Sequence, residues 1–169
     1  MRPDRWRATR AEWVGLASVA VAAVAADQLT KAAVSRSLAL GDSVDVGWRA
    51  LTLWHVQNKG IAFGAFTNQL PIVTLLTAAA VVWMLVFFAR SGARHPLVPV
   101  ALGLLLGGSL SNLWDRIAHG SVTDFIYLHW WPTFNFADSF IVVGVGLLLW
   151  VILRQDRGAH EPAIDLTNR

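Results

Sequence analysis

The chain has 169 residues, of which 55% are hydrophobic, and it contains nine Trp and eight Phe. A soluble domain of this length cannot bury so much apolar surface, so the composition excludes a soluble globular protein and predicts a membrane protein. The net charge of +3 is too small to indicate nucleic-acid binding, and the absence of cysteine excludes disulfides, thiolate metal sites and a cysteine nucleophile.

The first predicted membrane span covers about residues 13–34. Four arginines precede it, but the uncharged run from Trp13 to Ala26 would reach only about 21 Å as a helix, short of the roughly 30 Å hydrocarbon core. We therefore expect the helix to continue through Asp27 and Lys31. Two simpler interpretations stay open: a cleavable signal peptide, and a plain i,i+4 pair between Asp27 and Lys31.

Between about residues 38 and 67 the pattern changes to alternation interrupted by glycines. Val44, Val46 and Trp48 alternate with other residues, as in a short strand. We predict a small extramembrane β-sheet here. The same segment holds Asn58 and Gly60, where the backbone can turn tightly; taken alone, this feature is most simply a plain turn.

Further apolar runs predict spans at about residues 70–89, 98–115 and 137–153. In the second of these, Gly103, Gly107 and Ser111 recur every four residues and form a small stripe against which another helix can pack. Before the last span, Val122 to Leu128 resembles a strand, and Tyr127, Trp130 and Trp131 suit the lipid headgroup level. We predict an all-α membrane protein in one domain over residues 1–169, with four transmembrane helices and a small outer β-sheet.

The distribution of basic residues predicts the orientation in the membrane. The N-terminus, the connection at residues 90–95 and the C-terminal tail hold nine of the 14 Lys and Arg residues. By the positive-inside rule both termini are cytoplasmic. The predicted sheet, Asp27, Asp124 and Asp138 then lie on the outer, periplasmic side.

The stretch from residue 107 to residue 139 is unusually polar for a segment between two apolar runs. Its polar side chains include Asn112, Asp115, Arg116, Asp124, Asn135 and Asp138. Ionisable groups at a membrane edge are costly to place, so they indicate a functional site. We take Asp124 and Asp138 as its centre.

The residues present favour a carboxylate mechanism over other hydrolytic chemistry. The chain has no His-Glu-x-x-His motif, and Ser109 and Ser111 have no histidine on the same span, so small-residue packing explains these serines better. Two carboxyl groups held close together share one proton, so one can activate water while the other hydrogen-bonds the scissile carbonyl. Two alternatives stay open: Asp138 as a first-turn acid favoured by the helix dipole, and Asp124 as an ion-pair partner of Arg116.

Five motifs in order along the chain resemble those of lipoprotein signal peptidase, the aspartyl signal peptidase II family of bacteria. They are Asp27-Gln28-Leu29-Thr30-Lys31, Asn58-Lys59-Gly60-Ile61-Ala62-Phe63-Gly64, Ser111-Asn112-Leu113-Trp114-Asp115-Arg116, Val122-Thr123-Asp124-Phe125 and Phe134-Asn135-Phe136-Ala137-Asp138. The resemblance covers essentially the whole chain. Ile61, Ser111 and Trp114 depart from the residues usual in the family, and these departures affect fine specificity rather than the reaction.

The resemblance implies an intramembrane aspartyl endopeptidase that removes the signal peptide from diacylglyceryl-modified prolipoproteins by cleaving before the lipidated Cys. It implies that Asp124 and Asp138 are the catalytic pair and that no metal or cofactor takes part. The residues it implies as substrate-binding or supporting are Asp27, Lys31, Asn58, Gly60, Phe63, Asn112, Asp115, Arg116, Asn135 and Ala137. Membrane lipid and globomycin-like peptide inhibitors are the other expected partners of this monomeric, multi-pass protein of the bacterial inner membrane.

The main alternative is a proton- or ion-translocating protein that uses Asp27, Asp124 and Asp138. A relay needs ionisable groups through the whole depth of the membrane. Here they gather near one side, and the second span has none. A purely structural subunit is a further alternative, which predicts that neutral substitutions at Asp124 and Asp138 are tolerated.

Overall fold

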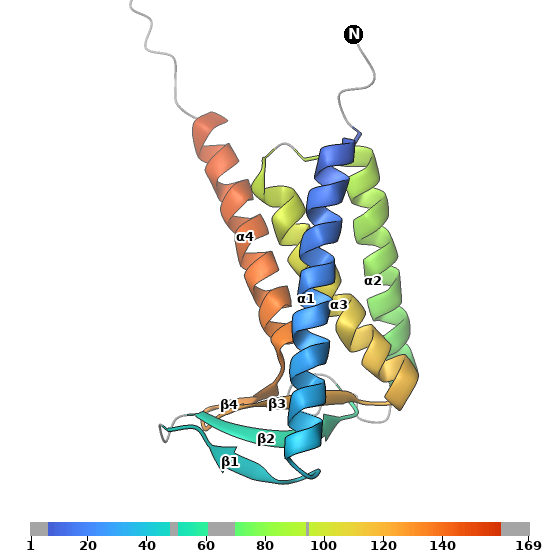
Figure 1. The fold of residues 1–169 in the computed structure, drawn as a ribbon. Coiled ribbons are helices and arrows are strands. Elements are labelled where there is room, and N and C mark those ends of the chain that lie inside the picture. The colour runs from blue at the N-terminus through green and yellow to red at the C-terminus, as the bar shows by residue number, and fades with distance from the viewer. Residues whose placement is uncertain (1–6, 48–50, 61–69, 94, 160–169) are drawn as a thin grey trace, which may run out of the picture.

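The computed structural model describes residues 7–47, 51–60, 70–93 and 95–159, the last five without their side chains. Four helices run side by side, and four short strands lie at one end of them (Figure 1). The helices are α1 (Arg10–Ser37), α2 (Leu70–Ser91), α3 (Leu97–His119) and α4 (Phe136–Ala159). Each is long and apolar enough to cross a membrane. The predicted fold class is thus confirmed.

The helix that contains Asp27 and Lys31 is continuous, as the length argument predicts. Thr9 caps its N-terminus through a reciprocal pair of hydrogen bonds with Glu12, and the helix runs unbroken to Ser37. Leu16, Ala20 and Ala23 lie buried along the same helix. The first span is therefore an integral part of the bundle core.

Helix α3 lies at the centre of the bundle, packed between α1 and α4, and α2 packs chiefly against α3. Gly107 allows the close approach of α1, because a Cβ atom there would lie 2.7 Å from both the Ala20 carbonyl oxygen and Ala23 Cβ. On the adjoining face, a Cβ on Gly108 would clash with the Ala137 carbonyl oxygen of α4. The small-residue stripe thus packs as predicted, and Gly108 provides a second close contact.

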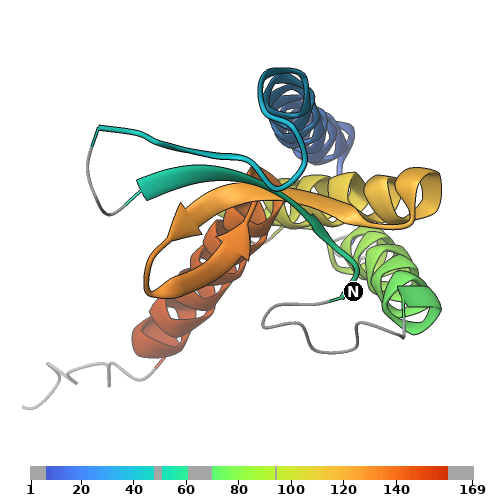
Figure 2. The same cartoon turned by 90° about the horizontal axis from the view of Figure 1, so that it is seen from below.

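The strands form one antiparallel sheet in the order β1-β2-β3-β4, which crosses the end of the bundle (Figure 2). They are β1 (Ser43–Asp45), β2 (Leu51–Asn58), β3 (Val122–Leu128) and β4 (Trp131–Phe134). The sequence patterns at residues 38–67 and 122–128 located the first three. Strand β4 was not predicted, because its Trp and Pro residues give no strand periodicity. The pairing of Val56 with Asp124 brings the end of β2 beside β3.

Candidate active site

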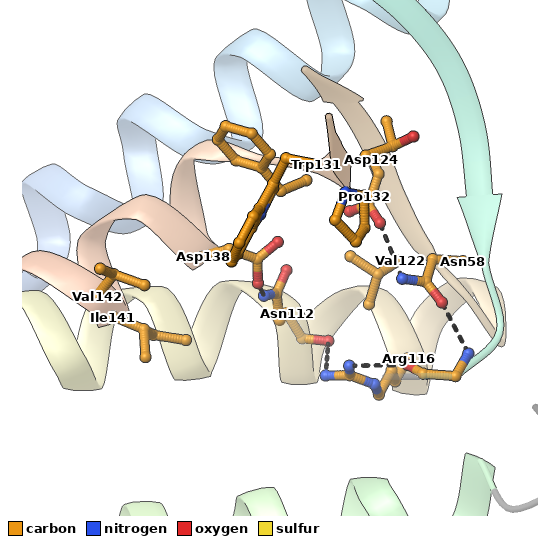
Figure 3. A pocket seen from close by; sticks show the side chains of 13 residues that line it. Asn58, Asn112, Arg116, Val122, Asp124, Trp131, Pro132, Asp138, Ile141 and Val142 are labelled. Atoms are coloured by element: carbon orange, nitrogen blue, oxygen red, sulfur yellow. Dashed lines mark hydrogen bonds between the residues drawn. The ribbon is translucent and has the colours of Figure 1, made fainter. Parts of the chain in front are cut away.

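The two acids singled out in the sequence lie on different elements that meet at the sheet end of the bundle. Asp124 is in β3 and Asp138 is in the first turn of α4. Both line one cavity of about 230 Å³, together with Asn112 and Arg116 from α3 and Asn58 from β2 (Figure 3). The fold therefore brings the predicted catalytic pair to a common space.

Asn135 connects the two acids. Its side-chain Nδ2 donates to Asp124 Oδ1 at 2.7 Å, and its backbone N–H donates to Asp138 Oδ2 at 3.2 Å. In return, its Oδ1 accepts a hydrogen bond from the backbone N–H of Asp138, which completes a capping arrangement at the start of α4. Asp138 is thus a first-turn acid, as one alternative held, and it also faces the cavity.

Amide groups also hold the remaining carboxylate oxygens. Asn58 Nδ2 donates to Asp124 Oδ2 at 2.9 Å, and Asn112 Nδ2 donates to Asp138 Oδ1 at 2.9 Å (Figure 3). Each of the four oxygens of the pair therefore accepts at least one N–H. This fixes both side chains while leaving each oxygen a second lone pair for a proton, a water molecule or a peptide.

The environment of Asp124 favours the protonated form. Its side chain is 2% exposed, and this burial, with the nearby charge of Asp138, raises the pKa of Asp124 to about 7. The hydrogen bonds from Asn58 and Asn135 and the charge of Lys31 act in the opposite direction but do not cancel the effect of burial. Asp124 can therefore retain a proton near neutral pH, as a proton-sharing pair requires.

Behind the acids lies a buried ionic cluster. Lys31 Nζ lies 2.6 Å from Asp27 Oδ2 and 2.8 Å from Asp115 Oδ2, and all three residues are at most 4% exposed. The i,i+4 pair therefore forms, but as part of a larger cluster. Lys31 Nζ also donates to Asn112 Oδ1 at 3.0 Å, so the amide nitrogen of Asn112 is directed toward Asp138.

Asp27 joins the first, third and fourth helices. Its Oδ1 accepts the backbone N–H of Ala137 at 2.9 Å, and its Oδ2 accepts the hydroxyl of Ser111 at 2.6 Å. Gln28 Nε2 donates to both Ser111 Oγ and Asp115 Oδ1. The interpretation of Ser111 as a small packing residue was therefore incomplete. Gln28 was not predicted as a site residue, although it follows Asp27 in the first of the five motifs.

Arg116 lies at the edge of the cavity with weakly engaged donors. Its Nη1 and Nη2 reach the carbonyl oxygens of Asn112 and Gly60 at 3.4 and 3.5 Å, and its buried Nε has no hydrogen-bond partner. In the described part of the chain the ion pairs are those of Lys31, so the alternative of an Asp124–Arg116 pair finds no support.

The turn after β2 brings Asn58 and Gly60 to the cavity. The backbone N–H of Gly60 donates to Asn58 Oδ1 at 2.9 Å, so the tight turn forms and leaves the amide nitrogen of Asn58 free to reach Asp124. Phe63, also predicted to bind substrate, lies outside the described residues. Among the residues that are described, no group of three or more His, Cys, Asp or Glu is placed to hold a metal ion.

Comparison with known proteins identifies the family of this chain. Residues 19–154 match the family model described as signal peptidase (SPase) II. Over 145 residues the chain is 39% identical to the lipoprotein signal peptidase from Symbiobacterium thermophilum, and the match covers 83% of this chain and 95% of that protein. It is 41% identical over 138 residues to the lipoprotein signal peptidase from Syntrophotalea carbinolica, covering 78% and 86% of the two chains.

A solved structure described as a bacterial membrane enzyme superposes on this fold with a TM-score of 0.81 and 27% sequence identity, and the match covers 94% of this chain and 96% of the other. Fold, motif order and family model thus agree. The chain belongs to the signal peptidase II family and is a multi-pass bacterial membrane enzyme, a peptidase of the aspartic type.

Proposed function

We propose that this enzyme removes the signal peptide from diacylglyceryl-modified prolipoproteins by cleaving before the lipidated Cys, with Asp124 and Asp138 as the catalytic pair. The observation that carries this proposal is that both acids line one cavity and are joined through Asn135. The pKa of Asp124 is raised to about 7, so this acid can hold the proton that the reaction needs. The class of substrate follows from the names of the relatives.

The reaction needs one proton on the pair. The ionised acid takes a proton from a water molecule, whose oxygen attacks the scissile carbonyl carbon, while the protonated acid gives its proton to the carbonyl oxygen. The tetrahedral intermediate then returns a hydroxyl proton to one acid, and the other acid protonates the leaving amide nitrogen as the C–N bond breaks. The pair ends with the single proton with which it began.

Arg116 and Asn112 act around this pair in the proposed mechanism. The contacts of Arg116 Nη1 and Nη2 are long, so these two donors stay available for a backbone carbonyl of the substrate. Asn112, oriented by Lys31, holds Asp138 Oδ1. Asn112 thereby positions a reacting group without itself needing to contact the substrate.

The proposed placement puts the site at the outer leaflet. The described chain begins and ends at the end of the bundle opposite the sheet (Figure 1), and the basic residues favour a cytoplasmic position for that end. The acids and the sheet then face the periplasm, where a lipid-modified precursor presents its scissile bond. In the proposed function the enzyme acts as a monomer, and globomycin-like peptides would compete for the same cavity.

The test is cleavage of a synthetic precursor by the reconstituted full-length protein. We expect scission on the N-terminal side of the Cys when that residue carries a diacylglyceryl group, and much slower turnover of the unmodified peptide. EDTA is expected to leave the rate unchanged. Loss of activity in EDTA with recovery on adding zinc would contradict the carboxylate mechanism, and proton flux through the protein without cleavage would favour translocation instead.

The rate is expected to fall as the pH rises above about 7. Because burial raises the pKa of Asp124 to about 7, the acid is protonated below this pH and loses its proton above it. A doubly ionised pair has no proton to donate, so kcat/KM should drop by about tenfold for each further pH unit. The measurement is the pH profile of kcat/KM, which reports the free enzyme.

Asn58→Leu is expected to move the alkaline limb of that profile to higher pH. The hydrogen bond from Asn58 favours the ionised carboxylate, so its removal raises the pKa of Asp124 further. Gln57→Leu, at the exposed neighbouring position in β2, is the matched control and should leave the limb in place. If the alkaline limb of Asn58→Leu stays at the same pH, the limb does not reflect the titration of Asp124.

A further inference from the structure

A second cavity, of about 370 Å³, adjoins the one that contains the acids. Its apolar lining comes from the end of β3, the turn to β4, β4 itself and α4: Leu128, Trp130, Trp131, Phe134, Val142 and Val143. Asp138 and Ser139 stand at its edge. The two cavities share Trp131, Phe134, Asp138 and Val142, so one continuous wall leads from the proposed catalytic acid into an apolar space.

We propose that this second cavity, the α4–β4 cavity, receives an acyl chain of the substrate's diacylglyceryl group; this inference rests on the proposed function. In such a substrate the leaving nitrogen belongs to the modified Cys itself. Only its Cα and Cβ separate that nitrogen from the sulfur that carries the glyceryl group. The lipid must therefore leave the catalytic cavity within a few bond lengths of Asp138, and the α4–β4 cavity opens there.

Another large apolar cavity of the described residues does not meet this requirement. It lies between α2, α3 and α4, has a volume of about 580 Å³ and is lined by residues such as Trp83, Leu102, Leu105 and Leu148. It shares no lining residue with the catalytic cavity. Its nearest α3 residue to Asn112 is Leu105, seven positions and thus about 10 Å along the helix. A lipid attached next to the scissile bond reaches the α4–β4 cavity first.

The lining of the α4–β4 cavity also suits the chemistry of a glycerolipid. Trp130 and Trp131 are 75% and 50% exposed, with ring centroids 6.1 Å apart, and such side chains favour the interface where glycerol esters lie. Val142 and Val143, one turn farther along α4 than Asp138, are 70% and 51% exposed. Trp131, Asp138 and Val142 stand on the side of the catalytic cavity away from Asn58 (Figure 3).

A substitution that fills the cavity tests this assignment. Val143 lines the α4–β4 cavity but not the catalytic cavity, so Val143→Trp should displace an acyl chain without touching the acids. We expect KM for a dipalmitoylglyceryl precursor peptide to rise about tenfold, which is the cost of exposing about two methylenes. Turnover at saturation should stay nearly constant, and kinetics with a diacetylglyceryl peptide should not change. Leu149→Trp, similarly exposed and about two turns away on α4, is the control and should affect neither substrate.

A second measurement does not use the Val143→Trp variant. The Asp124→Asn protein is mixed with a precursor peptide that bears a photoreactive acyl chain, and the cross-linked segment is identified. Cross-linking to the segments around residues 128–131 and 139–143 supports the assignment, whereas cross-linking to residues 83–87 overturns it.

The kinetic outcomes separate this inference from the proposed function. Three outcomes would overturn the acyl-chain assignment: an equal rise in KM for both substrates, an unchanged KM in Val143→Trp, or the same rise in KM in Leu149→Trp. In each case, cleavage of the lipid-modified peptide by the unaltered enzyme would still support the proposed function. If the unaltered enzyme cleaves neither peptide, the proposed function fails, and the inference fails with it.

Discussion

Replacing either Asp124 or Asp138 with Asn is expected to abolish effective cleavage of a lipid-modified precursor, with kcat reduced by about 10²- to 10⁴-fold. An amide can neither accept a proton from water nor return one to the leaving nitrogen. Because Asn135 contacts both side chains, the two substitutions should be about equally severe. The measurement is single-turnover cleavage of the diacylglyceryl peptide by each purified variant in lipid.

The folded state of these variants must be shown separately. Asp124 and Asp138 each accept hydrogen bonds from neighbouring amides, so Asn at either position loses part of this network while keeping the same shape. Thermal unfolding should therefore shift only modestly. Asp42→Asn, an exposed acid in the same extramembrane part of the chain, is the matched control and should retain full activity. Substantial turnover in Asp124→Asn or Asp138→Asn would show that the carboxylate pair is not required for catalysis and would favour a structural role for the pair.

Lys31→Met is expected to lower the free energy of unfolding by about 3–5 kcal/mol, because it breaks a buried ionic cluster. The substitution leaves Asp27 and Asp115 buried beside each other without their cation. It also removes the donor that orients Asn112, so activity should fall as well. Denaturant unfolding in detergent micelles measures the first effect, and cleavage of the diacylglyceryl peptide measures the second.

A matched substitution and a double variant isolate the cause. Arg36→Met removes a cation from the exposed last turn of α1 and should cost little stability. Lys31→Met combined with Asp27→Asn restores the net charge of the cluster, because one buried acid then remains in place of two acids and one cation. The double variant should recover part of the lost stability. A Lys31→Met protein as stable as Arg36→Met would contradict the energetic role assigned to the cluster.

The spans were predictable because continuous apolar runs report membrane helices directly. The length of the run before Asp27 was enough to place Asp27 and Lys31 inside α1, and the structure bears this out. In contrast, β4 was not predicted, since Trp131 and Pro132 give no alternating pattern. The strand forms by the pairing of Trp131 and Phe134 with β3.

The candidate site was only partly readable from the sequence. Its acids could be singled out because few other hydrolytic chemistries were possible, but their meeting in one cavity depends on the pairing of β3 with β2 and on the position of α4. Helical spacing marked Ser111 as small without indicating that its hydroxyl reaches Asp27. Gln28 was missed for the same reason: its contacts cross from α1 to α3, and sequence spacing reports neighbours within one helix only.

Helix α1 contains both a buried acid, Asp27, and its counterion, Lys31. Asp27 and Lys31 lie one helical turn apart in α1 and contact each other at 2.6 Å, so the nascent segment can partition into lipid as an electrically neutral unit before the later helices are synthesised. Asp115 lies next to Arg116 on α3, and its ion pair with Lys31 forms only when α3 docks against α1. The order of synthesis thus matches the order in which the charges can be compensated.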